Sequence, residues 1–166
     1  MLLMEPSVEY RVSQDISKIV KSSSFSYPSI GEFALESIAE LLEDKLLLTL
    51  VIKEGIPYKL FEIIQDHTPF TDADWATFLG LSTKSLQRYK RDDTPFKSLQ
   101  TEKILEVMEV CHLALDVFGD RAKFKLWLHT PTLALGSHTP ISLLSDSYGK
   151  DLVMTELVRI DHGIFV

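Results

Sequence analysis

The sequence predicts an all-α protein in which a helix-turn-helix segment precedes a small helical C-terminal domain. Apolar residues recur at steps of three and four along most of the chain, which is the spacing of one face of an α-helix. Glycine and proline separate these segments, and no stretch shows the alternation typical of a half-buried strand. We therefore predict a weakly ordered segment at 1–29, a helical domain at 30–117 with its helix-turn-helix at 71–91, and a second helical domain at 118–166.

Composition narrows the possible function classes. The chain has 166 residues, of which 45% are hydrophobic and 25% charged, as in ordinary globular proteins. Its formal charge of -7 argues against indiscriminate coating of nucleic acid but allows a local basic patch. The single cysteine, Cys111, suits a reducing, cytoplasmic location. With neither a signal peptide nor an apolar run long enough to span a bilayer, no membrane association is expected.

Residues that favour helix ends bound the expected helices. The first long helix is expected over 30–53, with Gly55 ending it. Thr71 and Asp74 have the spacing of a capping box, and Ser82 is a second N-cap. Further helices are expected at 57–66, 71–79, 83–91, 100–118, 120–129 and 150–161.

Two features of the C-terminal part complete this assignment. Thr139 followed by Pro140 predicts a helix with threonine as its cap and proline at its first position. Residues 146–149 are expected to form a turn before the last helix.

The strongest local signal is a helix-turn-helix in residues 75–89. The first helix needs a small residue where the second helix crosses it, and Ala76 supplies one. Gly80 allows the positive φ that the turn requires, and Leu86 returns an apolar side chain to the core. Leu79 and Leu81 are expected to bracket the turn as core residues.

The second helix of this motif would lie in the major groove of DNA. Between Lys84 and Lys103 there are six basic residues and three acidic ones, so this stretch is positive in an acidic chain. A helical hairpin with a solvated charged face is the alternative, and binding to an operator would require a homodimer. The candidate DNA contacts are Lys84, Ser85, Gln87, Arg88, Lys90 and Arg91, with Arg88 and Gln87 able to read bases and Lys90 and Arg91 suited to phosphates.

No catalytic, metal or cofactor site is expected. Cys111 and His112 could suggest a nucleophile and base, but neighbouring helical residues point in different directions and Cys111 lies in the densest apolar stretch. The histidines show no metal-like spacing, and no glycine-rich phosphate loop is present. We predict that the protein is not an enzyme, while a small helical enzyme with an unrecognised site stays a weaker hypothesis.

A resemblance to a known family rests on an ordered series of motifs in the last fifty residues. These are Val117-Phe118-Gly119-Asp120, Trp127-Leu128, Leu133-Ala134-Leu135-Gly136, Thr139-Pro140-Ile141-Ser142-Leu143-Leu144, Gly149, Val153 and Leu157-Val158-Arg159-Ile160-Asp161-His162-Gly163. Their order resembles the toxin-binding domain of the Xre/MbcA/ParS antitoxins, and residues 75–91 resemble the Xre-like helix-turn-helix that precedes it. Ser137 and Asp161 depart from the family pattern, where glycine and glutamate are common.

The resemblance implies a type II antitoxin. Its partner would be a RES-domain toxin, which depletes cellular NAD, and the C-terminal domain would cover the toxin's active site. The complex would also bind its own operator DNA as an autorepressor. A stand-alone transcriptional regulator, whose C-terminal domain serves dimerisation, is the alternative. The expected toxin contacts are Leu135, Gly136, Ser137, His138, Thr139, Arg159, Asp161, His162, Gly163, Ile164, Phe165 and Val166, with the apolar tail as a main inhibitory element.

Overall fold

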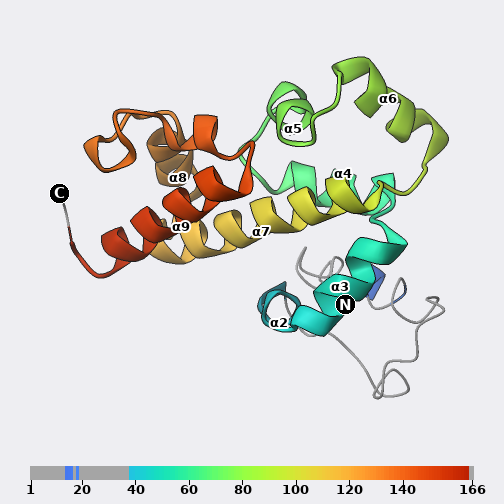
Figure 1. Cartoon of the computed structure of the whole chain (residues 1–166), viewed down its shortest axis with the longest axis horizontal. Coiled ribbons are helices and arrows are strands. Elements are labelled where there is room, and N and C mark those ends of the chain that lie inside the picture. The colour runs from blue at the N-terminus through green and yellow to red at the C-terminus, as the bar shows by residue number, and fades with distance from the viewer. Residues whose placement is uncertain (1–13, 17, 19–37, 165–166) are drawn as a thin grey trace, which may run out of the picture. The chain divides into compact units, whose positions relative to one another are not determined.

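The computed structural model describes residues 14–16, 18 and 38–164, and its regular elements are helices (Figure 1). An isolated antiparallel bridge between Thr132 and His138 is the exception. The all-α prediction is therefore confirmed. The expectation of weak order at 1–29 falls mostly outside the described residues, of which 14–16 and 18 are helical. None of the described helices is long and apolar enough to cross a membrane.

The described chain forms two compact units, each built from two separate segments. The first combines the chain up to His67 with Gln87–Glu102, and the second combines Thr68–Leu86 with Lys103 onwards. The sequence-based division at 118 stays a prediction.

The first unit contains α2 (Ile38–Glu43), α3 (Lys45–Glu54) and α4 (Tyr58–Asp66). A single helix over 30–53 is predicted; residues 30–37 lie outside the described residues, and over 38–53 the prediction is wrong because the helix breaks at Asp44. The Asp44 backbone is extended, and its carboxylate accepts a 3.0 Å hydrogen bond from the Leu47 N–H. Asp44 thus acts as an N-cap that starts a new helix.

The segment before α7 (Ser98–Phe118) packs against the turn that follows α3. Gly55 has a φ of 85°, and a Cβ there would lie 2.4 Å from the Phe96 carbonyl oxygen, so glycine permits this close approach. The Phe96 N–H donates to the Ile56 carbonyl at 2.9 Å. The Phe96 ring meets Phe61 edge-on at 5.0 Å, which makes this segment part of a rigid aromatic core.

In the second unit, α5 (Asp72–Phe78) begins with the predicted capping box. The Thr71 hydroxyl accepts from the Asp74 N–H at 3.2 Å, and the Asp74 carboxylate accepts from the Thr71 N–H at 2.8 Å. Trp75 is fully buried and donates its indole N–H to the Thr68 hydroxyl at 3.3 Å. Phe70, Phe78 and Phe124 complete an aromatic cluster around it.

The second part of this unit is built on α7 from Lys103 onwards and on α8 (Arg121–Leu128). Asp120 is the N-cap of α8, and its carboxylate accepts from the Lys123 N–H at 3.2 Å. Phe124 and Leu128 of α8 are fully buried. The buried residues of α7 in this unit are Ile104, Leu105, Val107, Met108, Val110, Cys111 and Ala114, which fits the predicted central helix.

The C-terminal elements are η1 (Leu133–Leu135), η2 (Pro140–Leu143) and α9 (Ser147–Asp161), and both short helices pack against α9. Two predictions are corrected. The helix predicted after Thr139 does begin with Pro140 at its first position, but it is a short 3₁₀ helix and the Thr139 side chain does not cap it. The predicted turn at 146–149 is the start of α9, because the Asp146 carboxylate accepts from the Gly149 N–H at 2.8 Å.

Ion pairs join α9 to α7 within the second unit. The Lys150 ammonium lies 2.6 Å from a Glu109 carboxylate oxygen, and its side chain is 16% exposed. The Ser147 hydroxyl donates to Glu106 at 2.9 Å, and Lys103 also pairs with Glu106. Burial alone would lower the pKa of Lys150, but the hydrogen bond and charge of Glu109, with those of neighbouring carboxylates, raise it overall. The lysine is therefore held charged.

Candidate functional site

The helix-turn-helix has the local geometry that the sequence predicts. Gly80 has a φ of 61°, the Leu81 N–H donates to the Ala76 carbonyl at 2.9 Å and the Gly80 N–H donates to the Thr77 carbonyl at 3.1 Å. This pair of bonds is a Schellman motif, which ends α5 and fixes the direction of the following chain. Ala76, Leu79 and Leu86 are buried as expected, whereas Leu81 is half-buried.

The second helix, α6 (Thr83–Asp92), presents most of the candidate DNA contacts to solvent. Ser82 caps it, because its hydroxyl accepts from the Ser85 N–H at 3.1 Å. Leu86 alone of the helix is buried. Ser85 is half-buried, and the exposed candidates are Lys84, Gln87, Arg88, Lys90 and Arg91.

Two of these cations are already engaged by carboxylates. The Lys90 ammonium lies 2.8 Å from Glu62 of α4. The Arg91 guanidinium donates twice to Asp92, at 2.7 and 3.1 Å. Those hydrogen bonds hold the pKa of Asp92 below its ordinary value, so its carboxylate is charged at neutral pH. The positive charges of Lys90 and Arg91 are thus partly neutralised by carboxylates, and this end of α6 is less positive than a count of its basic residues suggests.

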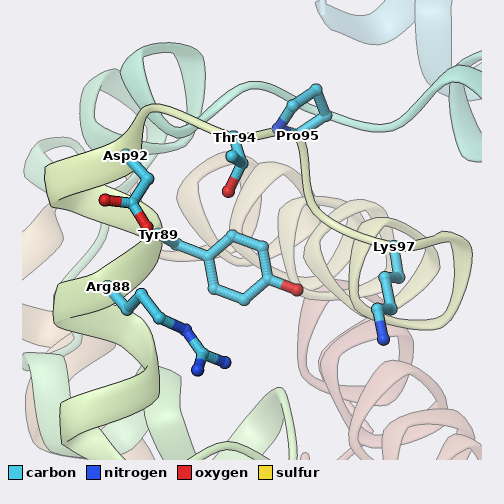
Figure 2. A pocket seen from close by; sticks show the side chains of 6 residues that line it. All are labelled: Arg88, Tyr89, Asp92, Thr94, Pro95 and Lys97. Atoms are coloured by element: carbon cyan, nitrogen blue, oxygen red, sulfur yellow. The ribbon is translucent and has the colours of Figure 1, made fainter.

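An open pocket of about 350 Å³ lies beside the C-terminal half of α6, within the first unit (Figure 2). Arg88 is the one candidate DNA contact among the residues that line it. Tyr89 and Lys97 also line it, although neither was among the predicted contacts. Lys97 had been counted in the basic stretch, but its placement beside Arg88 depends on the fold of residues 93–97. The lining residues are Arg88, Tyr89, Asp92, Thr94, Pro95 and Lys97.

The predicted toxin contacts at the end of α9 are exposed. Arg159, Asp161 and His162 all face solvent. A second Schellman motif ends the helix, in which the Ile164 N–H donates to the Arg159 carbonyl at 2.9 Å and Gly163 has a φ of 68°. Ile164 is 56% exposed. The remaining predicted tail residues, Phe165 and Val166, lie outside the described residues.

The predicted contact loop at 135–139 divides into a buried and an exposed part. Leu135 is buried and Thr139 half-buried, while Gly136, Ser137 and His138 are exposed. Gly136 and Ser137 are both left-handed, with φ of 65° and 64°. The Leu135 side chain therefore anchors the loop, and its neighbours form the accessible tip.

Exposed apolar residues add a feature that the sequence-based contacts missed. Tyr148 and Leu152 are 87% and 54% exposed and lie four residues apart on α9, so they share one face. Leu133 of η1 is 82% exposed. Tyr148 and Leu152 are four residues apart, and so are the buried Val153 and Leu157, which lie on a different face of the helix. This pattern is a signal in the sequence that could have identified the exposed face.

Cys111 and His112 do not form a catalytic pair. Cys111 is buried, and burial raises the pKa of its thiol to about 12. A thiol that stays protonated at neutral pH is a poor nucleophile. His112 instead lies 3.9 Å from Asp116, one turn along the same helix. In the described part of the chain, histidine, cysteine and carboxylate side chains form no cluster that could hold a metal ion.

Comparison with known proteins matches both the helix-turn-helix and the C-terminal segment to antitoxin domains. Residues 48–109 match the antitoxin Xre-like helix-turn-helix domain, and residues 113–163 match the antitoxin Xre/MbcA/ParS C-terminal toxin-binding domain. An "Antitoxin Xre" of Photorhabdus laumondii is 30% identical over 70% of this chain and 80% of its own length. A Yersinia enterocolitica protein of the same name is 30% identical over 69% of this chain and 78% of its own length. The chain belongs to the Xre/MbcA/ParS antitoxin family.

Proposed function

We propose that this antitoxin neutralises a RES-domain toxin, which depletes NAD, by covering the toxin's active site with its C-terminal domain. We also propose that it binds its own operator DNA as a homodimeric autorepressor. The observation that carries the first part is the exposed end of α9, where Arg159, Asp161, His162 and Ile164 face solvent beside a fixed helix end. The chain itself would act in the cytoplasm and without catalysis.

The end of α9 suits the task of closing a cleft in another protein. Its Schellman motif fixes the direction in which residue 164 leaves the helix, so little conformational entropy is lost on binding. Arg159 and Asp161 offer charges of both signs next to the apolar Ile164. An apolar side chain ringed by charged groups is the usual composition of an interface centre and its rim.

Coexpression with a RES-domain protein from the reading frame next to its gene tests this part, and a neighbour of any other kind would contradict the proposed partner. Wild-type protein should preserve growth and the cellular NAD level. The double variant Asp161→Arg with Ile164→Asp should fail to protect, and since both residues are exposed the fold should persist. Lys84→Glu is the matched control, because it reverses one exposed charge on α6 and should protect fully. Full protection by the double variant would refute this contact surface.

DNA binding has its own support in α6. The Schellman motif at Gly80 sets the direction in which the chain leaves α5, and Leu86 is the buried residue of α6, whose exposed face carries Lys84, Gln87 and Arg88. A helix held in this way can enter a major groove with its N-terminal residues at base edges. Lys90 and Arg91 lie near the opposite end, where phosphate contacts are expected.

Titration of a duplex from the gene's own promoter tests this second part. Lys84→Glu should weaken binding strongly, and Arg159→Glu should leave it unchanged. Analytical ultracentrifugation of the same samples should show a dimer on the duplex. A protein that binds the promoter but never rescues cells from the toxin would instead be a stand-alone regulator.

A further inference from the structure

The floor of the pocket beside α6 is the ring of Tyr89, which packing within the protein holds in place without a ligand. The Tyr89 ring stacks on Phe96 with centroids 4.5 Å apart and planes 21° apart. Phe96 is 2% exposed and its N–H is bonded to the Ile56 carbonyl, so the tyrosine rests on the core of the first unit. Figure 2 shows the phenol oxygen projecting across the pocket towards the Lys97 side. This hydroxyl is a donor held in place by packing.

Two cations flank this floor. Figure 2 shows Arg88 and Lys97 on opposite sides of the Tyr89 ring, and both residues are exposed. Within the described part of the chain, no carboxylate lies at ion-pair distance from either of them, in contrast to Lys90 with Glu62. Asp92 also lines the pocket, but its two oxygens accept hydrogen bonds from Arg91. The pocket is therefore positive overall.

This chemistry fits a singly charged phosphodiester. Guanidinium, ammonium and phenol groups are all donors, and the Thr94 hydroxyl adds a further one at the rim. Small-molecule sites are usually enclosed and mostly apolar. Here the rim residues Arg88, Thr94, Pro95 and Lys97 are exposed, which favours a phosphate presented by a larger molecule. A backbone phosphate at the edge of the groove that α6 enters has that geometry.

We propose that Arg88, Tyr89 and Lys97 together grip one phosphate of the DNA backbone next to the major groove. The inference rests on the proposed DNA binding. It gives Arg88 a positioning contact in place of the base contact expected from the sequence, and it extends the DNA surface past α6 to Lys97. Phosphate contacts fix the register of a protein on its duplex and carry no sequence information themselves.

The test compares a promoter duplex with a shuffled duplex of the same length over a series of salt concentrations. Lys97→Gln and Arg88→Gln should each weaken binding to both duplexes by the same factor, about three- to tenfold, and lower the salt slope by about 0.9. Tyr89→Phe keeps the stack on Phe96 and should weaken both duplexes about two- to fivefold. Lys125→Gln, an exposed lysine on α8, is the control and should change nothing.

The outcomes separate the two proposals. If wild-type protein binds neither duplex, both the proposed DNA binding and this pocket are wrong. If it binds and the three variants match wild type, the pocket alone is wrong. A loss confined to the promoter duplex in Arg88→Gln would show that Arg88 reads a base. Titration of inorganic phosphate alone should give weak binding, and tight binding that displaces the duplex would make the pocket a site for a free anion.

Discussion

Gly149 is the position where a single added carbon should reveal how α9 is seated. A Cβ built there would lie 2.0 Å from the Leu143 carbonyl oxygen and 2.9 Å from the Leu143 carbonyl carbon. Both are backbone atoms of η2, so no side-chain rotation relieves the clash. Gly149→Ala therefore requires the start of α9 and η2 to move apart.

The expected magnitude follows from two opposing effects. Overpacking a buried site costs about 1–3 kcal/mol, and a clash with backbone belongs at the upper end of that range. Replacing glycine by alanine inside a helix gives back about 1 kcal/mol. The net expectation is a destabilisation of about 1–2 kcal/mol, which lowers the melting temperature on the order of 5 °C.

Thermal unfolding followed by far-ultraviolet circular dichroism measures this change. Gly80→Ala is the control, because a Cβ there meets nothing within 4 Å and the cost is limited to the strain of a φ of 61°. Helix propensity alone predicts that Gly149→Ala is more stable than wild type. A melting temperature equal to or above that of wild type would therefore refute the argument from close approach.

Three further predictions concern Cys111, Lys150 and Ser137. Cys111 should react with iodoacetamide about three orders of magnitude more slowly in the native protein than after unfolding in urea, because its native pKa of about 12 exceeds the ordinary value of 9.0; equal rates would contradict its burial. Lys150→Met should destabilise the fold by about 1–3 kcal/mol in urea titrations, because it leaves Glu109 without its partner. Since the native pKa of Lys150 lies above 10.5, this difference should be complete below that pH and shrink as the pH rises past the native pKa; a pH-independent difference would argue against the ion pair. Ser137→Gly should change stability by less than about 1 kcal/mol and towards greater stability, because glycine accepts the φ of 64° without strain; a clear loss in the melting temperature would show that the serine side chain stabilises the loop.

Helix ends were predictable where a cap and its partner lie within one turn. Thr71 and Asp74 are three residues apart, and their capping box forms as the sequence indicates. Asp44 and Asp146 act through the same chemistry, but each follows residues that continue a helical or turn pattern. An aspartate in such a context can equally be a solvated surface residue. The choice depends on packing that a local pattern does not contain.

The sequence predicts the chemical type of the candidate site residues but not the partners that they contact in the fold. The sequence identifies Lys90 as a cation on an exposed helix, yet its partner Glu62 lies on a different helix. Lys97 joins Arg88 at one pocket because the chain around Phe96 folds back on the turn at Gly55. Leu135 lies in a loop rich in family motifs, but its side chain is needed in the core. Each of these outcomes is set by contacts distant in sequence.

The same backbone hydrogen-bonding pattern, a Schellman motif, precedes each of the two proposed interfaces. At Leu81 and at Ile164, the N–H reaches back to the fifth residue before it, Ala76 and Arg159 respectively, at 2.9 Å in both cases. A left-handed glycine precedes each, so the chain leaves the helix in one direction without strain. In the first case the motif sets the direction of the chain that leads to Ser82, the N-cap of α6, and in the second it sets the direction of Ile164. Because direction is set by backbone hydrogen bonds, the exposed side chains that follow can vary with the operator or the toxin while the scaffold that presents them stays the same.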